Sequence, residues 1–247
     1  MTFQRGIVLV HKWVALIIGI QIFLWICGGL VMSAIPIEIV HGEHKIAAPA
    51  PATFSVDEIV PLETAMSAAS FDTVKAASLG EVLGAPVWRL TNARGQTVTI
   101  SAATGEALSP ISESFAREIA LSDYSGSGAL ARVTLVDEPP SEYGRAGPVW
   151  QARFDDRDAT TLYIDPTTAT VRARRSTTWR FYDFFWKLHV MDYDDGASFN
   201  HPLLITAAGA GLVAALAGLI LLVLRMRVPF IRFRRFIARN LGREKLS

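Results

Sequence analysis

Histidine is the residue type whose placement most suggests chemistry in this chain, because neutral imidazole is the commonest metal ligand in proteins. His11 lies directly before a long apolar run near the start of the chain. The other four lie at the two borders of a polar central region, at His41, His44, His189 and His201. An ionisable side chain in or beside a membrane segment is costly to bury and is a candidate functional group by default. The histidines are therefore the first candidates for a metal or cofactor site.

Two short stretches hold the candidates for an outer metal site. His41-Gly42-Glu43-His44 differs from the zinc-protease pattern, because its histidines are three positions apart and its glycine disfavours a helix. The acidic stretch 192–196 follows His189 but lacks the register and the distal glutamate of a calcium loop. Metal binding by His41, His44 and His201 is a hypothesis that rests on residue type, since the pattern does not specify the number of ligands.

Two apolar runs, residues 13–32 and 202–224, bracket the polar region that these histidines border. Each is long enough to cross a hydrocarbon core of about 30 Å at a rise of about 1.5 Å per helical residue. A cleaved signal peptide is the alternative for the first run. Its apolar core is longer than usual, and Val31-Met32-Ser33-Ala34 is a poor cleavage site, so we expect the span to be retained.

The distribution of charge predicts the topology. The segment 36–201 contains 14 Lys and Arg against 22 Asp and Glu, whereas the tail after Leu224 carries eight basic residues and one acidic residue. Basic residues beside a span stay cytoplasmic, so both termini are predicted to be cytoplasmic and residues 36–201 to lie on the other side. The basic tail is typical of a topology signal that contacts anionic lipid, and no recognition motif points to nucleic acid. The single cysteine, Cys27, lies in the first span, which excludes disulfides and Cys-based metal sites from the exported domain.

The exported region reads as a duplicated small domain. Pro86-Val87-Trp88 recurs as Pro148-Val149-Trp150, and both copies continue as alternating apolar and polar residues around turns, which is typical of half-buried antiparallel strands. Helices are predicted over 55–70, with a weak point at Pro61, and over 111–122; strands are predicted near 73–79 and 131–136. Each unit is thus one helix followed by three strands, and the fold class is α+β.

These hairpins, together with Leu188-His189-Val190-Met191-Asp192-Tyr193 shortly before the second span, resemble the PepSY domain family in its form flanked by membrane helices. The resemblance covers nearly the whole chain. It implies an inner-membrane protein with a tandem of α-β-β-β repeats in the periplasm. The second repeat has Thr168-Ala169 where the family has a Thr-Gly turn, so we expect that turn to be built differently.

The resemblance also implies a cofactor. PepSY proteins with more spans are similar to haem-bearing reductases of iron and siderophore uptake, in which helix histidines hold b-type haem. That role would fall on His11 and His189. The segment 203–224 offers no His, Cys or Met, and His11 and His189 are expected roughly 30 Å apart at opposite membrane faces. One chain therefore cannot hold a haem with this pair, whereas a dimer or a partner subunit could. Otherwise His11 is an interfacial residue beside Trp13.

An aromatic segment over 177–201 is predicted to be an amphipathic helix at the membrane surface. Its aromatic residues, like Trp13 at the other span, match the belts that form at headgroup level; they are Trp179, Tyr182, Phe185 and Trp186. No nucleophile elbow, phosphate loop or dinucleotide fingerprint occurs, and the stretch 125–130 reads as a flexible link between the repeats. The chain is not expected to be an autonomous enzyme.

The sequence therefore predicts an accessory subunit of a membrane redox or metal (iron) uptake complex, with a b-type haem electron-transfer subunit as the alternative. Small residues in both spans, such as Gly28-Gly29 and Gly211, would let a partner or a second copy approach, or would pack the two spans of one chain together. The predicted segments are a first span (1–35), a linker (36–54), repeat 1 (55–110), repeat 2 (111–176), the aromatic segment (177–201), a second span (202–224) and a basic tail (225–247).

Overall fold

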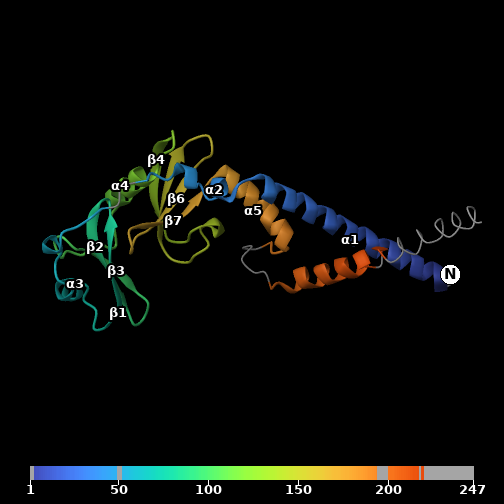
Figure 1. The fold of residues 1–247 in the computed structure, drawn as a ribbon, viewed down its shortest axis with the longest axis horizontal. Helices are drawn as coiled ribbons and strands as arrows, with labels where there is room; N and C mark the ends of the chain where they lie inside the picture. The colour runs from blue at the N-terminus through green and yellow to red at the C-terminus, as the bar shows by residue number, and fades with distance from the viewer. Residues whose placement is uncertain (1–2, 49–51, 194–199, 217, 220–247) are drawn as a thin grey trace, which may run out of the picture. The chain divides into compact units, whose positions relative to one another are not determined.

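The computed structural model describes residues 3–48, 52–193, 200–216 and 218–219. The chain divides into two compact units (Figure 1). Unit 1 combines residues 1–31 with residues 185–247, and unit 2 comprises residues 32–184. The apolar helices belong mainly to unit 1, and both sheets belong to unit 2.

Unit 1 is built from apolar helices. Helix α1 (Phe3–Ala34) contains a stretch, Ala15–Ala34, that is long and apolar enough to cross a membrane, with a mean hydropathy of 2.3. Its side chains are largely exposed in the isolated chain, as expected for a helix that faces lipid. The second predicted span begins as a shorter apolar helix, Pro202–Leu216. The rest of that span and the basic tail lie outside the described residues, so among the described residues one helix meets the criterion for crossing a membrane.

Unit 2 contains two antiparallel sheets. The first has the order β1 (Val74–Val82), β2 (Ala85–Asn92), β3 (Thr97–Ser101). The second has the order β4 (Ala129–Val136), β5 (Val149–Asp155), β6 (Thr161–Asp165), β7 (Thr170–Arg175). The α+β class is thus confirmed, but the second sheet has four strands where three were expected. In the first half the equivalent of β7 is only a bridge between Ile100 and Ala107, and Pro110 soon ends it because proline has no N–H to donate.

In unit 2, capping residues and a proline determine where several of the helical elements begin. Ser55 and Glu58 do form a capping box, but it closes a single 3₁₀ turn, η2 (Val56–Glu58). Pro61 then begins the separate helix α3 (Leu62–Ala68), so the continuous helix expected over 55–70 is two elements. Helix α4 (Glu113–Asp123) starts where Ser112 Oγ accepts a hydrogen bond from the N–H of Phe115. The remaining elements are α2 (Ile37–Val40), η1 (Glu43–Lys45), η3 (Ser141–Tyr143) and α5 (Thr177–Val190).

The two tryptophans occupy matching positions in the two sheets. Trp88 pairs with Leu79 and Ile100 across its sheet, and Trp150 pairs with Leu135 and Ile164. Each indole N–H donates to the carbonyl oxygen two residues before its own helix begins, at 3.1 Å, to Val60 before α3 and to Ile111 before α4. The same bond therefore ties each sheet to the start of its helix.

The turn at Thr168-Ala169 is built like the turn at Thr104-Gly105, which corrects the expectation from sequence. The N–H of Gly105 donates to Ser101 O at 2.8 Å, and the N–H of Ala169 donates to Asp165 O at 3.0 Å. Both residues have positive φ, +80° and +53° respectively. Alanine bears a cost of about 1–2 kcal/mol in this region of backbone space. Asp165 Oδ1 supports the strained turn by accepting the N–H groups of Thr167 and Thr168.

The core of unit 2 is shared between its two halves. Its main cluster combines Val82 and Val87 of the first sheet with buried residues of α4 and the second sheet, namely Ile111, Ala116, Ile119, Ala120, Val133, Ala152, Phe154, Leu162, Ile164 and Ala169. Polar bonds join the halves as well, because Thr99 Oγ1 donates to Thr167 O and Arg89 Nε donates to Thr168 O. The two halves therefore form one folded body.

Candidate functional site

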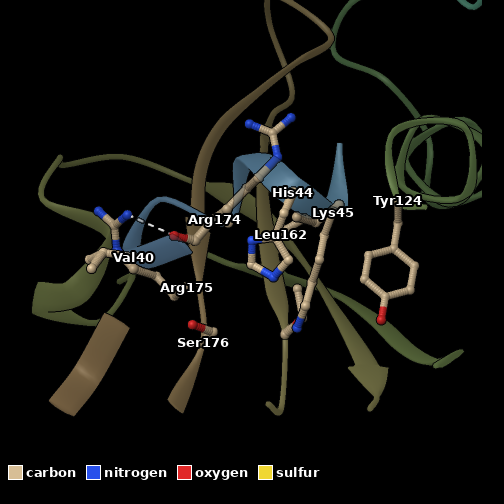
Figure 2. Close-up of a pocket in the computed structure, with 10 residues that line it drawn as sticks. Val40, His44, Lys45, Tyr124, Leu162, Arg174, Arg175 and Ser176 are labelled. Carbon is tan, nitrogen blue, oxygen red and sulfur yellow. Dashed lines mark hydrogen bonds between the residues drawn. The ribbon is translucent and has the colours of Figure 1, made fainter. Parts of the chain in front are cut away.

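The incoming and outgoing segments of unit 2 lie side by side on the second sheet. The incoming residues Val40, Gly42, His44 and Lys45 line a small cavity together with the outgoing residues Arg174, Arg175 and Ser176 (Figure 2). The volume of this cavity is about 10 Å³, which is room for one water molecule. Both segments are fixed by backbone bonds: Ala47 N–H donates to Asp123 O, Ser125 N–H donates to Lys45 O, and Thr177 N–H donates to Asp158 O.

Lys45 is the centre of this junction. Its Nζ lies 2.8 Å from Asp156 Oδ2 and 2.7 Å from Asp158 Oδ2, and it also donates to Thr160 Oγ1 at 3.1 Å. Its side chain is 15% exposed and that of Asp156 is 5% exposed, so the ion pair is largely removed from water. Lys45 lies 111 residues before Asp156 in the sequence. The segment that was expected to be a linker is thus held to repeat 2 by a buried ion pair.

Asp156 is strongly stabilised in its ionised form. Burial alone raises the pKa of its carboxyl group, but the hydrogen bonds from Lys45 and Thr160 outweigh burial and hold that pKa well below its usual range. Tyr124 also donates its hydroxyl to Asp156 Oδ2, at 2.9 Å. Burial raises the pKa of the Tyr124 hydroxyl, which keeps it a donor. The pKa of Lys45 is raised, because its bonds to the two aspartates outweigh the effect of its burial.

A second ionic network fixes the outgoing segment. Arg180 donates from Nε to Glu142 Oε2 at 2.7 Å and from Nη2 to Glu142 Oε1 at 2.9 Å, and Tyr163 donates to the same carboxylate at 2.6 Å. These bonds outweigh burial and lower the pKa of Glu142. Arg174 pairs with Asp123, and the guanidinium of Arg175 stacks over the ring of Trp179 at 4.1 Å. Trp179, predicted to face the membrane surface, therefore has a protein partner.

The arrangement is that of a structural clamp. Lys45 pairs with both aspartates beside it and offsets one of their two negative charges, and the arginines of the junction bind carboxylate or carbonyl oxygens. In the part of the chain that the structure describes, no group of three or more His, Cys, Asp or Glu side chains could hold a metal ion. Chemically, the junction can hold two chain segments in a fixed geometry; the cavity is too small for a substrate larger than water.

The histidines predicted to bind metal have separate environments. His41 is exposed, with Nδ1 3.6 Å from Glu43 Oε1, and His44 lines the junction cavity. His201 precedes the helix Pro202–Leu216, where its Nδ1 accepts the N–H of Leu203 at 3.3 Å. Since that nitrogen already caps a helix, only Nε2 of His201 is free to bind a ligand. Metal binding by His41, His44 and His201 stays a prediction.

The two histidines assigned to haem lie on different helices, His11 on α1 and His189 on α5. His189 packs against Gly28 of α1, because a Cβ placed on Gly28 would lie 3.6 Å from both Cβ and Nδ1 of His189. His11 belongs to the same unbroken helix, 17 positions earlier, which is roughly 25 Å at 1.5 Å per residue. Two axial ligands of one iron must lie on opposite sides of the same metal atom. His11 and His189 of one chain therefore do not fit a single haem.

Unit 1 also contains a cluster of polar atoms that sequence reasoning missed. Gln21 Nε2, Trp25 Nε1 and His189 Nδ1 are all buried and have no hydrogen-bond partner among the described residues. The rings of Trp25 and His189 are 6.5 Å apart. Gln21 and Trp25 are four positions apart on α1, and Gly28 follows three positions later, so the three residues share one helix face. That spacing is the sequence signal that could have found the cluster.

For the other residues predicted to lie at the membrane interface, that placement stays a prediction. Trp13 is 59% exposed on α1, and Tyr182, Phe185 and Trp186 are half-buried on α5. The backbone oxygen of Phe185 lies 3.4 Å from the position of a Cβ on Gly28, so the end of α5 in unit 1 contacts the same face of α1 as His189 does.

Comparison with known proteins identifies the family of the chain. No curated protein and no solved structure matches it significantly. One family model, described as the PepSY-associated TM region, matches residues 8–245, which is nearly the whole chain. The match covers α1 from residue 8 onward, both sheets and the helix Pro202–Leu216. The predicted resemblance is thus confirmed, and the chain belongs to the PepSY-associated TM region family of membrane proteins.

Proposed function

We propose that this membrane-anchored PepSY protein is an accessory subunit of a membrane redox or metal (iron) uptake complex, with residues 36–201 in the periplasm of a bacterium. The observation that carries the proposal is the junction clamp. Lys45 fixes the segment that follows α1, and the Glu142–Arg180 pair fixes the segment that leads out of repeat 2, both on the same small region of unit 2. Because both connections are fixed at one region of unit 2, the rest of its surface is left for contact with a partner.

The exposed edges of the two sheets support an interaction role. Strand β1 is an edge of the first sheet, and its residues 75–79 are exposed; β4 is the corresponding edge of the second sheet. An edge strand offers unpaired backbone donors and acceptors to a strand of another protein. Lys75 on β1 is the kind of charged residue that limits non-specific pairing at such an edge.

Adjacency of the incoming and outgoing segments supports the two-span topology. A domain anchored by helices at both its ends needs both connections on one side, which is where unit 2 has them. The test uses a variant in which Cys27, the single native cysteine, is replaced by serine. A cysteine at the exposed residue Ser141 should react with a membrane-impermeant thiol reagent added from the periplasmic side, and a cysteine at Ser247 should not. The reverse pattern would overturn the topology.

Partner binding is tested by co-purification. Full-length tagged protein, solubilised from its native membranes after cross-linking, should retain one defined membrane redox or uptake protein. Recovery of that protein should fall when Ser78 in the middle of β1 is replaced by glutamate, and it should persist when the exposed Glu113 of α4 is replaced by glutamine. Loss of the gene should also slow growth under iron limitation. If the strain that lacks the gene grew as fast as the unaltered strain under iron limitation, the uptake role would be contradicted.

The alternative function, a b-type haem electron-transfer subunit, requires His11 to act in an oligomer. One chain separates His11 from His189 by roughly 25 Å of helix, so a second ligand would have to come from another copy or subunit. An absorbance spectrum of the purified protein in detergent distinguishes the two functions. We expect a colourless protein; a Soret band that disappears in His11→Ala and on dissociation of the subunits would favour the haem function.

A further inference from the structure

Strand β1 is an open edge of the first sheet. In the part of the chain that the structure describes, β1 pairs with β2 alone, and its residues 75–79 are exposed although they alternate between the two faces of the sheet. Edge strands are usually short, covered or interrupted by charge. The stretch 76–79 carries no charge, and its charged neighbours are Lys75 before it and Glu81 after it. This edge is therefore open to pairing with another strand.

The turn that joins β1 to β2 decides which backbone groups of β1 point outward. It has two residues, 83 and 84, both with positive φ, +53° and +76°, and Val82 is the last residue of β1 before it. The residues that flank such a turn form a hydrogen-bonded pair, and the two kinds of pair then alternate along the ladder. Ser78 therefore bonds to β2, whereas Ala77 and Leu79 turn their N–H and C=O groups away from it.

The two ends of the open stretch agree with this pattern. Glu81 also faces outward by the same alternation, and its carbonyl oxygen accepts a hydrogen bond from Arg89 Nη2 at 3.2 Å. At the other end the register of β1 and β2 shifts at Lys75, which is the extra residue of a bulge. The open stretch is thus bounded on both sides, and the outward backbone groups between these limits belong to Ala77 and Leu79.

The charges beside the stretch are complementary to themselves. Lys75 and Glu81 lie three positions on either side of Ser78. If a second β1 pairs antiparallel with a two-fold axis at Ser78, Lys75 of each copy comes opposite Glu81 of the other. The same register brings Ala77 opposite Leu79, so their outward N–H and C=O groups bond to each other. An axis one residue earlier or later would place Lys75 opposite a leucine instead.

We propose that β1 pairs with β1 of a second copy of this chain, which joins the two first sheets into one continuous antiparallel sheet. Leu79, 43% exposed in the single chain, packs against Ala77 of the other copy. The ladder is short, but two copies anchored in one membrane meet at a high effective concentration. The inference rests on the interaction role proposed for the β1 edge and assigns that edge to a second copy. Ser78→Glu then lowers recovery of the redox protein through loss of the pair.

Disulfide cross-linking tests the pairing and its register. Full-length Cys27→Ser protein receives one cysteine in place of Ala77, Ser78 or Leu79 and is oxidised with copper phenanthroline in its native membranes. The two copies of residue 78 form a non-hydrogen-bonded pair with Cα atoms about 4.5 Å apart, which suits a disulfide. The two copies of residue 77, or of residue 79, are about 8 Å apart, which is too far. We expect a dimer band on a non-reducing gel for Ser78→Cys, with Ala77→Cys and Leu79→Cys as matched controls that give at most a trace.

The charge pairs are tested in the Ser78→Cys protein. Lys75→Glu places like charges opposite each other and should lower the cross-linked fraction about fivefold. Lys75→Arg keeps the charge and should keep the band. Lys75→Glu/Glu81→Lys exchanges the two charges and should restore the band, although Glu81 Oε2 also accepts the N–H of Ala52.

Three results would overturn the inference. They are a Ser78→Cys protein that stays monomeric, bands of equal strength for all three cysteine positions, and equal cross-linking in Lys75→Glu and Lys75→Arg. Failure of the proposed function gives a different result. A Ser78→Cys cross-link without a co-purified redox protein would contradict that function alone, whereas co-purification of that protein without the cross-link would contradict this inference alone.

Discussion

Replacing Lys45 by methionine tests the central claim about unit 2. Methionine keeps the length and apolar contacts of the stem but removes the positive charge that pairs with Asp156 and Asp158. Removal of one partner from a buried ion pair costs about 3–5 kcal/mol, because the other charge stays buried. Asp156 is 5% exposed but retains the Thr160 and Tyr124 donors, and Asp158 is 35% exposed and can recover water. We therefore expect the low end of that range, about 3 kcal/mol.

The assay is thermal unfolding of the full-length protein in detergent, followed by circular dichroism in the β-sheet region. For a folded body of about 150–250 residues, 1 kcal/mol shifts the midpoint by about 2–4 °C, so Lys45→Met should lower it by roughly 6–12 °C. Lys75→Met, at an exposed position on β1, is the matched control and should stay within about 2 °C. The double variant Lys45→Met/Asp156→Asn should recover part of the loss, because the uncompensated charge is gone.

The pH dependence gives a second check. The pKa of Asp156 is lowered in the folded protein, so its contribution to stability is complete above the unfolded value of about 4 and is lost as the pH falls toward the folded value. The difference between the unaltered protein and Lys45→Met should therefore be large at pH 7 and shrink below about pH 4. The structural role of Lys45 would be refuted if Lys45→Met lowered the thermal midpoint no more than Lys75→Met does. It would also be refuted if the loss of midpoint caused by Lys45→Met were the same at pH 7 and at pH 3.

Three further predictions concern other parts of the molecule. Trp150→Phe should lower the free energy of unfolding, measured with denaturant, by about 1–2 kcal/mol, because the carbonyl of Ile111 loses its donor. Trp88→Phe should lower it by a similar amount, because the carbonyl of Val60 loses its donor. Strongly unequal effects would contradict the matching positions of the two tryptophans. Gly105→Ala should cost about 1–2 kcal/mol by the same measurement, since φ is +80° and the new Cβ would lie 3.3 Å from Thr64 Cγ2; an unchanged midpoint would contradict the strain argument. His11→Ala should leave the purified protein as colourless and as stable as before.

Local patterns in the sequence were sufficient for much of the fold. The apolar stretch of α1, the alternating strands and the capping box each depend on neighbours a few positions apart, and each is found in the structure. The matching of Trp88 and Trp150 follows from the repeated Pro-Val-Trp motif. The family was predicted from the same motifs and is confirmed by the match over residues 8–245.

Local patterns gave the wrong expectation for the turn at Thr168-Ala169 and for the number of strands in the second sheet. Ala169 adopts the turn of a glycine with the support of Asp165 and the surrounding core, and strand β7 pairs along the length of β6. The first repeat offers Ala107 only a single bridge, so the equivalent strand is missing there in the described chain.

The candidate sites show the same division. The sequence by itself determined which residues could do chemistry, from their types and their distance from the apolar runs. Only the tertiary structure decided which of them meet: Lys45 reaches Asp156 across 111 residues, His189 packs beside Trp25, and His11 stays roughly 25 Å along the helix from Gly28. A helix or strand is specified by its own neighbours, whereas an ion pair or a cavity is specified by how whole elements pack, and packing depends on the entire chain at once.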